Sequence, residues 1–141
     1  MYRFLLLLHL VSAVAAFGPT LVLPLFTRQD PRAGAGQVTA VLQRVVTPGL
    51  VGLIVFGSGL VATVEGDRYS FSQAWVSLAF LVVLAALAVV WLVLVPRQRR
   101  MVAARTEGDA ARLARQSAGL FGALHLLLVI GLVLMVWKPG Q

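Results

Sequence analysis

Four long apolar stretches, none of which contains a charged residue, divide the chain into spans and connections. They run from about residue 4 to 26, 45 to 64, 74 to 95 and 117 to 137. A helix needs roughly 20 apolar residues to cross a bilayer core about 30 Å thick, and each stretch meets that length. No alternation of period two competes with this pattern. The sequence therefore predicts an all-α, polytopic membrane protein, a four-transmembrane-helix bundle that forms a single transmembrane domain over residues 1–141.

The basic residues are concentrated on two of the three connections. Nine of the twelve lie in or beside the first and third connections, namely Arg28, Arg32, Arg44, Arg97, Arg99, Arg100, Arg105, Arg112 and Arg115. Because basic residues mark the cytoplasmic side, these connections are expected inside and both termini outside. The third connection, residues 96–116, is predicted as a basic cytoplasmic loop whose Ala- and Arg-rich pattern can extend the third and fourth helices as a solvated helical hairpin, with a turn at Glu107-Gly108-Asp109. The alternative is a docking surface for a partner. The arginines of this connection are expected to bind anionic lipid headgroups.

The composition supports a membrane location and removes several kinds of chemistry. Hydrophobic residues make up 60% of the chain and charged residues 12%, whereas a soluble domain carries about 25% charge. The chain has no cysteine, which excludes disulfides, zinc–thiolate sites and thiol catalysis. The topology accounts for the net charge of +7, so nucleic acid is not an expected partner. The first apolar run extends to Phe26, too long for a signal peptide, and an uncleaved helix is expected.

Small and polar residues form a stripe on three of the four predicted helices. The stripes comprise His9, Ser12, Ala13, Ala16 and Thr20 in the first helix, Pro48, Gly49, Gly52, Phe56 and Gly59 in the second, and Ala118, Gly119, Gly122 and His125 in the fourth. Small residues let helix backbones approach closely in a membrane, so these stripes are predicted to face the bundle interior. Ser12, Gly52 and Gly122 would make room there for a cofactor. Glu65 and Asp67 are predicted to form a polar turn outside.

His9 and His125 are the only ionisable residues inside the apolar spans. Such groups are costly in a bilayer, so each is a candidate functional residue. Neutral imidazole is a good ligand for haem or copper. The alternative is that each histidine is hydrogen-bonded across helices and purely structural. Counted from the outer edge, the two lie at depths that differ by about 9 Å, which a tilted haem ring between them could accommodate.

Several segments, taken in order, resemble a known group of proteins. Leu8-His9 is followed by Gly18 and Pro24; Arg44 is followed by Thr47-Pro48 and Gly57; Trp75 opens the third helix; the chain ends with Val136-Trp137-Lys138-Pro139. This pattern resembles a family of uncharacterised small bacterial integral membrane proteins, itself similar to CopD-like membrane domains and HemJ-type protoporphyrinogen oxidases. The resemblance implies a haem b ligand at His9. The HemJ-type lysine after the tryptophan of helix three is missing here, which disfavours protoporphyrinogen oxidation.

The sequence thus supports one leading hypothesis and two alternatives. The leading one is a haem b-binding redox or haem-handling protein of the bacterial inner membrane, with His9 and His125 as axial ligands. The alternatives are a cofactor-free structural or accessory subunit and a copper-handling component. Beyond the lipid bilayer, the expected partners are a second copy of the chain or a membrane redox protein. The residues assign no specific reaction.

Overall fold

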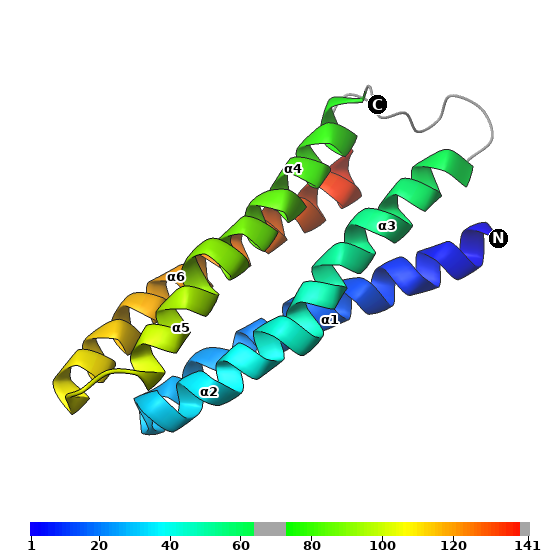
Figure 1. Cartoon of the computed structure of the whole chain (residues 1–141). Coiled ribbons are helices and arrows are strands. Elements are labelled where there is room, and N and C mark those ends of the chain that lie inside the picture. Colours follow the sequence, from blue (N-terminus) through cyan, green and yellow to red (C-terminus); the bar gives the residue numbers. More distant parts are fainter. Residues whose placement is uncertain (64–72, 139–141) are drawn as a thin grey trace.

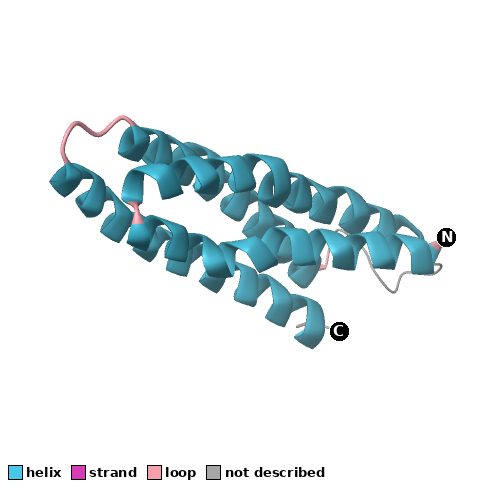
Figure 2. Cartoon of the chain, turned by 90° about the horizontal axis from the view of Figure 1, so that it is seen from below, coloured by secondary structure: helices cyan, strands magenta, loops and turns pink. Residues whose placement is uncertain are grey.

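A computed structural model of the chain describes residues 1–63 and 73–138 and shows four long helices side by side (Figures 1 and 2). The first is α1 (Tyr2–Gln29) and the fourth is α6 (Glu107–Trp137). The second and third are each interrupted by a short π-helical segment. They consist of α2 (Pro31–Val41), η1 (Leu42–Val46) and α3 (Thr47–Thr63), and of α4 (Ala74–Ala88), η2 (Val89–Leu94) and α5 (Val95–Val102). The protein is an all-α four-helix bundle, as the sequence predicts.

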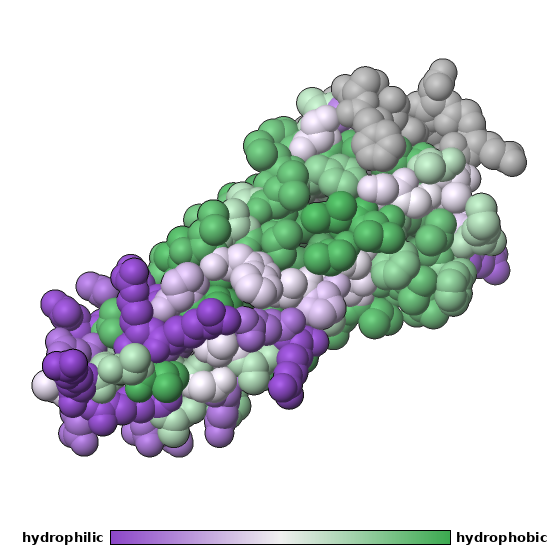
Figure 3. Space-filling view, in the orientation of Figure 1, coloured by the Kyte–Doolittle hydropathy of each residue, from purple (hydrophilic) through white to green (hydrophobic). Residues whose placement is uncertain are grey.

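Each of the four helices is long and apolar enough to cross a membrane. A broad apolar surface covers the middle of the face seen in Figure 3, and the polar residues of that face gather at the end formed by α2, α5 and the start of α6. We call this the arginine-rich end. The opposite end, where α1 begins and α6 finishes, we call the terminal end. The chain is therefore a multi-pass membrane protein whose helices contact lipid along their apolar outer faces.

The helices are longer than the apolar stretches, and the expected boundaries at the arginine-rich end are wrong. The second helix starts at Pro31 rather than residue 45, the third continues to Val102, and the fourth starts at Glu107. The third connection is thus only residues 103–106, because the third and fourth helices extend through most of residues 96–116, as the Ala- and Arg-rich pattern allows. Arg44 lies well inside the second helix, in η1. Hydropathy identifies only the part of a helix that needs an apolar surface, so it misses the polar extensions that pack against each other outside the hydrocarbon core.

These extensions have their own start signals and a small core. The Asp30 side chain accepts hydrogen bonds from the backbone of Arg32 and Ala33, and Pro31 occupies the first turn, which is a favourable place for proline. Ala35, Met101 and Ala110 are buried together where α2, α5 and α6 meet. The arginines therefore lie on a packed helical extension of the bundle, which includes the helical hairpin predicted for the third connection and an extension of the second helix that was not predicted.

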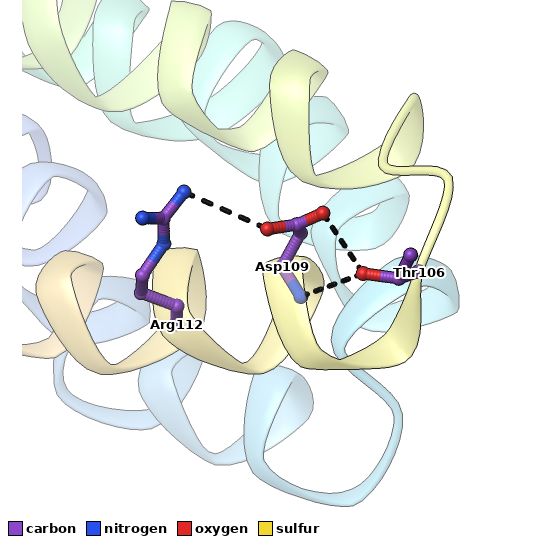
Figure 4. A network of polar contacts seen from close by, with 3 residues as sticks. All are labelled: Thr106, Asp109 and Arg112. Carbon is purple, nitrogen blue, oxygen red and sulfur yellow. Dashed lines mark hydrogen bonds and ion pairs between the residues drawn. The ribbon is translucent and has the colours of Figure 1, made fainter.

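The turn expected at Glu107-Gly108-Asp109 is instead the first turn of α6, because Thr106 caps it (Figure 4). The Thr106 hydroxyl accepts a hydrogen bond from the Asp109 backbone N–H at 3.1 Å and donates one to Asp109 Oδ2 at 2.8 Å. Arg112 lies 3.6 Å from the other carboxylate oxygen. Acidic side chains in a first turn also complement the positive end of the helix dipole. The break in hydropathy at these residues marks a helix start, not a loop.

Two prolines that would break a helix are accommodated by the π-helical segments. The Thr47 and Val95 N–H groups bond five residues back, to the carbonyls of Leu42 and Val90, directly before Pro48 and Pro96. This wider turn lets the helix pass a residue that has no N–H to donate. Pro48 therefore lies well inside the second helix, which starts at Pro31 and not near residue 45 as predicted. Trp91 Nε1 donates to Thr47 Oγ1 at 3.1 Å, which ties the two interrupted helices together.

Candidate functional site

His9 is held against α3 near the terminal end of the bundle. Its side chain is only 8% exposed, and Nδ1 is buried with no hydrogen-bond partner among the described residues. A Cβ placed on Gly57 would lie 3.4 Å from the His9 Cε1 atom and 3.5 Å from Nδ1, so this edge of the ring rests on the α3 backbone. The backbone of Leu53, one turn earlier, also lies beside the imidazole. The ring is thus buried against α3, with no hydrogen bond to Nδ1 among the described residues.

A cavity of about 250 Å³ opens beside His9 between the terminal halves of α1, α3, α4 and α6. Its walls are mostly aliphatic and aromatic, with Trp75 and Phe80 on α4. Apolar walls with a few polar groups are the usual lining of a small-molecule or cofactor site. Among the described residues, His9 is the one histidine that is buried with an unpartnered ring nitrogen. The cavity beside it suits a largely apolar ligand.

The mouth of the cavity carries its cationic group. Lys138 ends α6 in a left-handed conformation (φ 41°), and its Nζ lies 5.8 Å from the centre of the Trp75 ring, within the range of a cation–π contact. Tyr2 lines the same mouth from α1. Neither Lys138 nor Trp75 was predicted to belong to a site, because each lies at the edge of an apolar stretch. The sequence held one indication of such a role: a lysine side chain at a helix end is long enough to reach back over the last turn.

His125 lies elsewhere and is already engaged. Its Nε2 is 3.1 Å from the Thr20 hydroxyl, and that hydroxyl donates its only proton to the Phe17 carbonyl at 2.7 Å. The contact between His125 and Thr20 joins α1 to α6. It is the kind of cross-helix contact that the structural alternative for this histidine predicts.

The two histidines are too far apart to bind one haem iron. His125 contacts α1 at Thr20, and His9 lies eleven residues away on the same helix, about 16 Å along its axis. The depths counted from the ends of the apolar stretches underestimated this separation, because the ends of different stretches do not lie at the same depth in the bundle. The predicted bis-histidine pair is therefore excluded in this arrangement.

Of the small residues expected to make room for a cofactor, two are brought together and one is not. Ser12 lies one turn from His9 on α1, and a Cβ on Gly52 would collide with its hydroxyl. Both belong to the tight contact between α1 and α3. Gly122 is exposed, and a Cβ added there would meet nothing within 4 Å, so its predicted place in the interior is wrong. The buried face of α6 carries larger residues instead, among them Phe121, Leu124 and Leu128.

Comparisons with family models, curated proteins and solved structures give no match. The resemblance to CopD-like and HemJ-type proteins thus stays a prediction. Glu65 and Asp67 lie outside the described residues. Within residues 1–63 and 73–138, no three histidine, cysteine or acidic side chains gather into a metal site. His9 and its cavity are therefore the candidate site that the described part of the chain offers.

Proposed function

We propose that this protein binds haem b in the membrane through His9 and serves in electron transfer or haem handling. The observation that carries the proposal is the His9 imidazole, buried yet unpartnered among the described residues at the wall of an apolar cavity. An unsatisfied buried polar group costs roughly 1–3 kcal/mol, and no hydrogen bond to Nδ1 among the described residues offsets that cost or gives His9 a purely structural reason for its burial. Haem is the group whose chemistry matches, since one histidine holds its iron while apolar walls cover its ring.

The residues around His9 can each take a role toward that group. A ligating histidine commonly donates its second N–H to a backbone carbonyl, which fixes the ring, and the Leu53 carbonyl is placed to accept it. Gly57 leaves the imidazole room against α3. Lys138 at the mouth would suit the two carboxylates of haem, and Trp75 and Phe80 in the cavity wall would help to keep water out. When bound, haem would supply one-electron transfer, and its surroundings would set the potential.

The test is an absorption spectrum of the purified protein, produced with ample haem and recorded oxidised and dithionite-reduced. We expect a stoichiometric Soret band and sharp reduced α and β bands, lost in His9→Ala and retained in the matched control His125→Ala. A colourless wild type, or equal loss in both variants, would refute the assignment of His9. A colourless wild type would favour the second candidate, a cofactor-free accessory subunit, which the cross-helix contact between His125 and Thr20 supports.

The location proposed for this site is the outer half of a bacterial inner membrane, with both termini outside. The support is that α2, α5 and the start of α6 bring most of the arginines to one end, where they would contact anionic headgroups on the cytoplasmic side (Figure 3).

The chain has no cysteine, so single-cysteine variants can be labelled without background. We expect Glu107→Cys to react with an impermeant maleimide only after membranes are opened, and Arg3→Cys to react in intact cells. The reverse result would invert the orientation.

A further inference from the structure

We propose that the cavity beside His9 binds the hydrocarbon chain of a long-chain fatty acid, whose carboxylate lies at the mouth beside Lys138. This site goes beyond the proposed function, because it names a second ligand that the cavity takes at its present size of about 250 Å³. A haem ring is wider than this cavity, so haem enters only if the helices around it move apart. The fatty acid and haem therefore exclude each other.

The described residues that line the cavity cover a similar length on three helices. The lining runs from Tyr2 to His9 on α1, from Leu53 to Val61 on α3, and from Trp75 to Val83 on α4. At a rise of 1.5 Å per residue, each of these segments is about 10–12 Å long. The cavity therefore extends along the helices, from the mouth at the terminal end toward the middle of the bundle.

The width of this space corresponds to one hydrocarbon chain. A volume of about 250 Å³ spread over about 12 Å gives a mean cross-section of about 20 Å². One extended alkyl chain has a cross-section of that size, whereas two chains side by side or a broad ring system need more. Apolar walls lose dispersion contacts where no atom lies against them, so a single chain that fills this space restores those contacts.

The mouth of the cavity supplies the groups that suit a carboxylate. Lys138 Nζ lies 5.8 Å from the centre of the Trp75 ring, and Tyr2 lines the same mouth. Lysine and aromatic side chains at helix ends lie at the level of the membrane–water interface, which is also where the carboxylate of a fatty acid lies. An ammonium and a carboxylate form a charge-assisted hydrogen bond.

This polar contact decides which single-chain molecule the cavity prefers. Lipid is as apolar as the cavity wall, so the chain alone gains little by leaving the bilayer. The ammonium of Lys138 favours a fatty acid over the neutral alcohol of the same length. An exposed ion pair is worth up to about 1 kcal/mol, so we expect a preference of about fivefold.

The experiment uses the purified full chain in detergent micelles and a stearic acid that carries a photoreactive diazirine at mid-chain. With the carboxylate at the mouth, the middle of the chain reaches the inner end of the cavity. We therefore expect saturable adducts around Leu53 and Val83, which line that end. Unlabelled stearic acid should prevent them at a concentration about fivefold lower than stearyl alcohol requires.

Two pairs of variants test the site. Ala79→Phe places a ring in the cavity and should abolish the saturable adducts, whereas Ala118→Phe adds the same ring on the exposed face of α6 and should leave them. Lys138→Gln should remove the preference for the acid over the alcohol, and Lys138→Arg should keep it. The second pair leaves the cavity walls unchanged, so it tests the proposal even if Ala79→Phe fails to fold.

Three results would overturn the proposal: adducts that do not saturate, equal protection by stearic acid and stearyl alcohol, and an unchanged preference in Lys138→Gln. Stronger protection by an anionic phospholipid than by stearic acid would also overturn it, since the ligand would then be a phospholipid. The haem spectrum separates this proposal from the proposed function. A colourless protein with saturable adducts retains the fatty-acid site and loses haem, and a Soret band without saturable adducts does the reverse.

Discussion

The contact between α1 and α3 leaves no space for a side chain at Gly49, and this closeness can be tested by a single methyl group. A Cβ at Gly49 would lie 2.6 Å from the Ala16 backbone nitrogen, 2.9 Å from the Ser12 carbonyl oxygen and 3.0 Å from the Ala15 carbonyl carbon. All three atoms belong to helix backbone, which cannot rotate out of the way. We expect Gly49→Ala to force the two helices apart.

The expected cost follows from these distances. Non-bonded carbon atoms rest at about 3.5–4.0 Å, so the helices must separate locally by about 1 Å, and a gap of that size forfeits a quarter to a half of each affected contact. Overpacking of this kind costs about 1–3 kcal/mol. Alanine gains back up to about 1 kcal/mol in helix propensity. Gly122→Ala on the exposed face of α6 shares that gain and meets nothing within 4 Å, so it is the matched control.

The assay is unfolding in mixed micelles by increasing dodecyl sulfate, followed by tryptophan fluorescence, with Trp75 buried in the native state. We expect Gly49→Ala to be less stable than Gly122→Ala by about 1–3 kcal/mol, the cost of overpacking alone. Equal stabilities of the two variants would show that α1 and α3 are not in backbone contact at this position, and the placement of His9 against α3 would lose its basis.

Three further substitutions test other parts of the structure. Gln98 is fully buried with both amide atoms unpartnered among the described residues, so Gln98→Met should raise the unfolding free energy by about 1–3 kcal/mol in the same assay, and a loss would reveal an unseen partner. Thr20→Val removes the hydrogen bond to His125 and should cost about 0.6–1.7 kcal/mol while leaving any Soret band intact. Thr106→Ala removes the cap of α6 and should cost about 0.5–2 kcal/mol, with faster hydrogen exchange confined to its first turn; exchange unchanged at Asp109 would contradict the cap.

The fold was predictable from the sequence where the bilayer dictates the pattern. Unpaired backbone groups cannot exist in hydrocarbon, so a long uncharged stretch specifies a helix almost without reference to its neighbours. At the arginine-rich end water replaces lipid, and helix limits depend on local signals such as Asp30 before Pro31 and Thr106 before Glu107. Those signals were in the sequence, but the hydropathy pattern does not contain them. The π-turns before Pro48 and Pro96 could not be predicted, because they depend on what packs against each helix.

The candidate site shows the same division between local and long-range information. His9 and His125 both occur within Leu-His-Leu, so no local pattern distinguishes them. The two histidines differ in what they contact on the neighbouring helix. His9 lies against the Gly57 backbone beside an apolar cavity, whereas His125 contacts the Thr20 hydroxyl. That hydroxyl also bonds to the Phe17 carbonyl, so the Thr20 side chain links His125 to the backbone of α1. His9 Nδ1 meets no such group among the described residues, and the side chain borders the apolar cavity instead. Which histidine can act is therefore decided by contacts between α1, α3 and α6 that no stretch of sequence records.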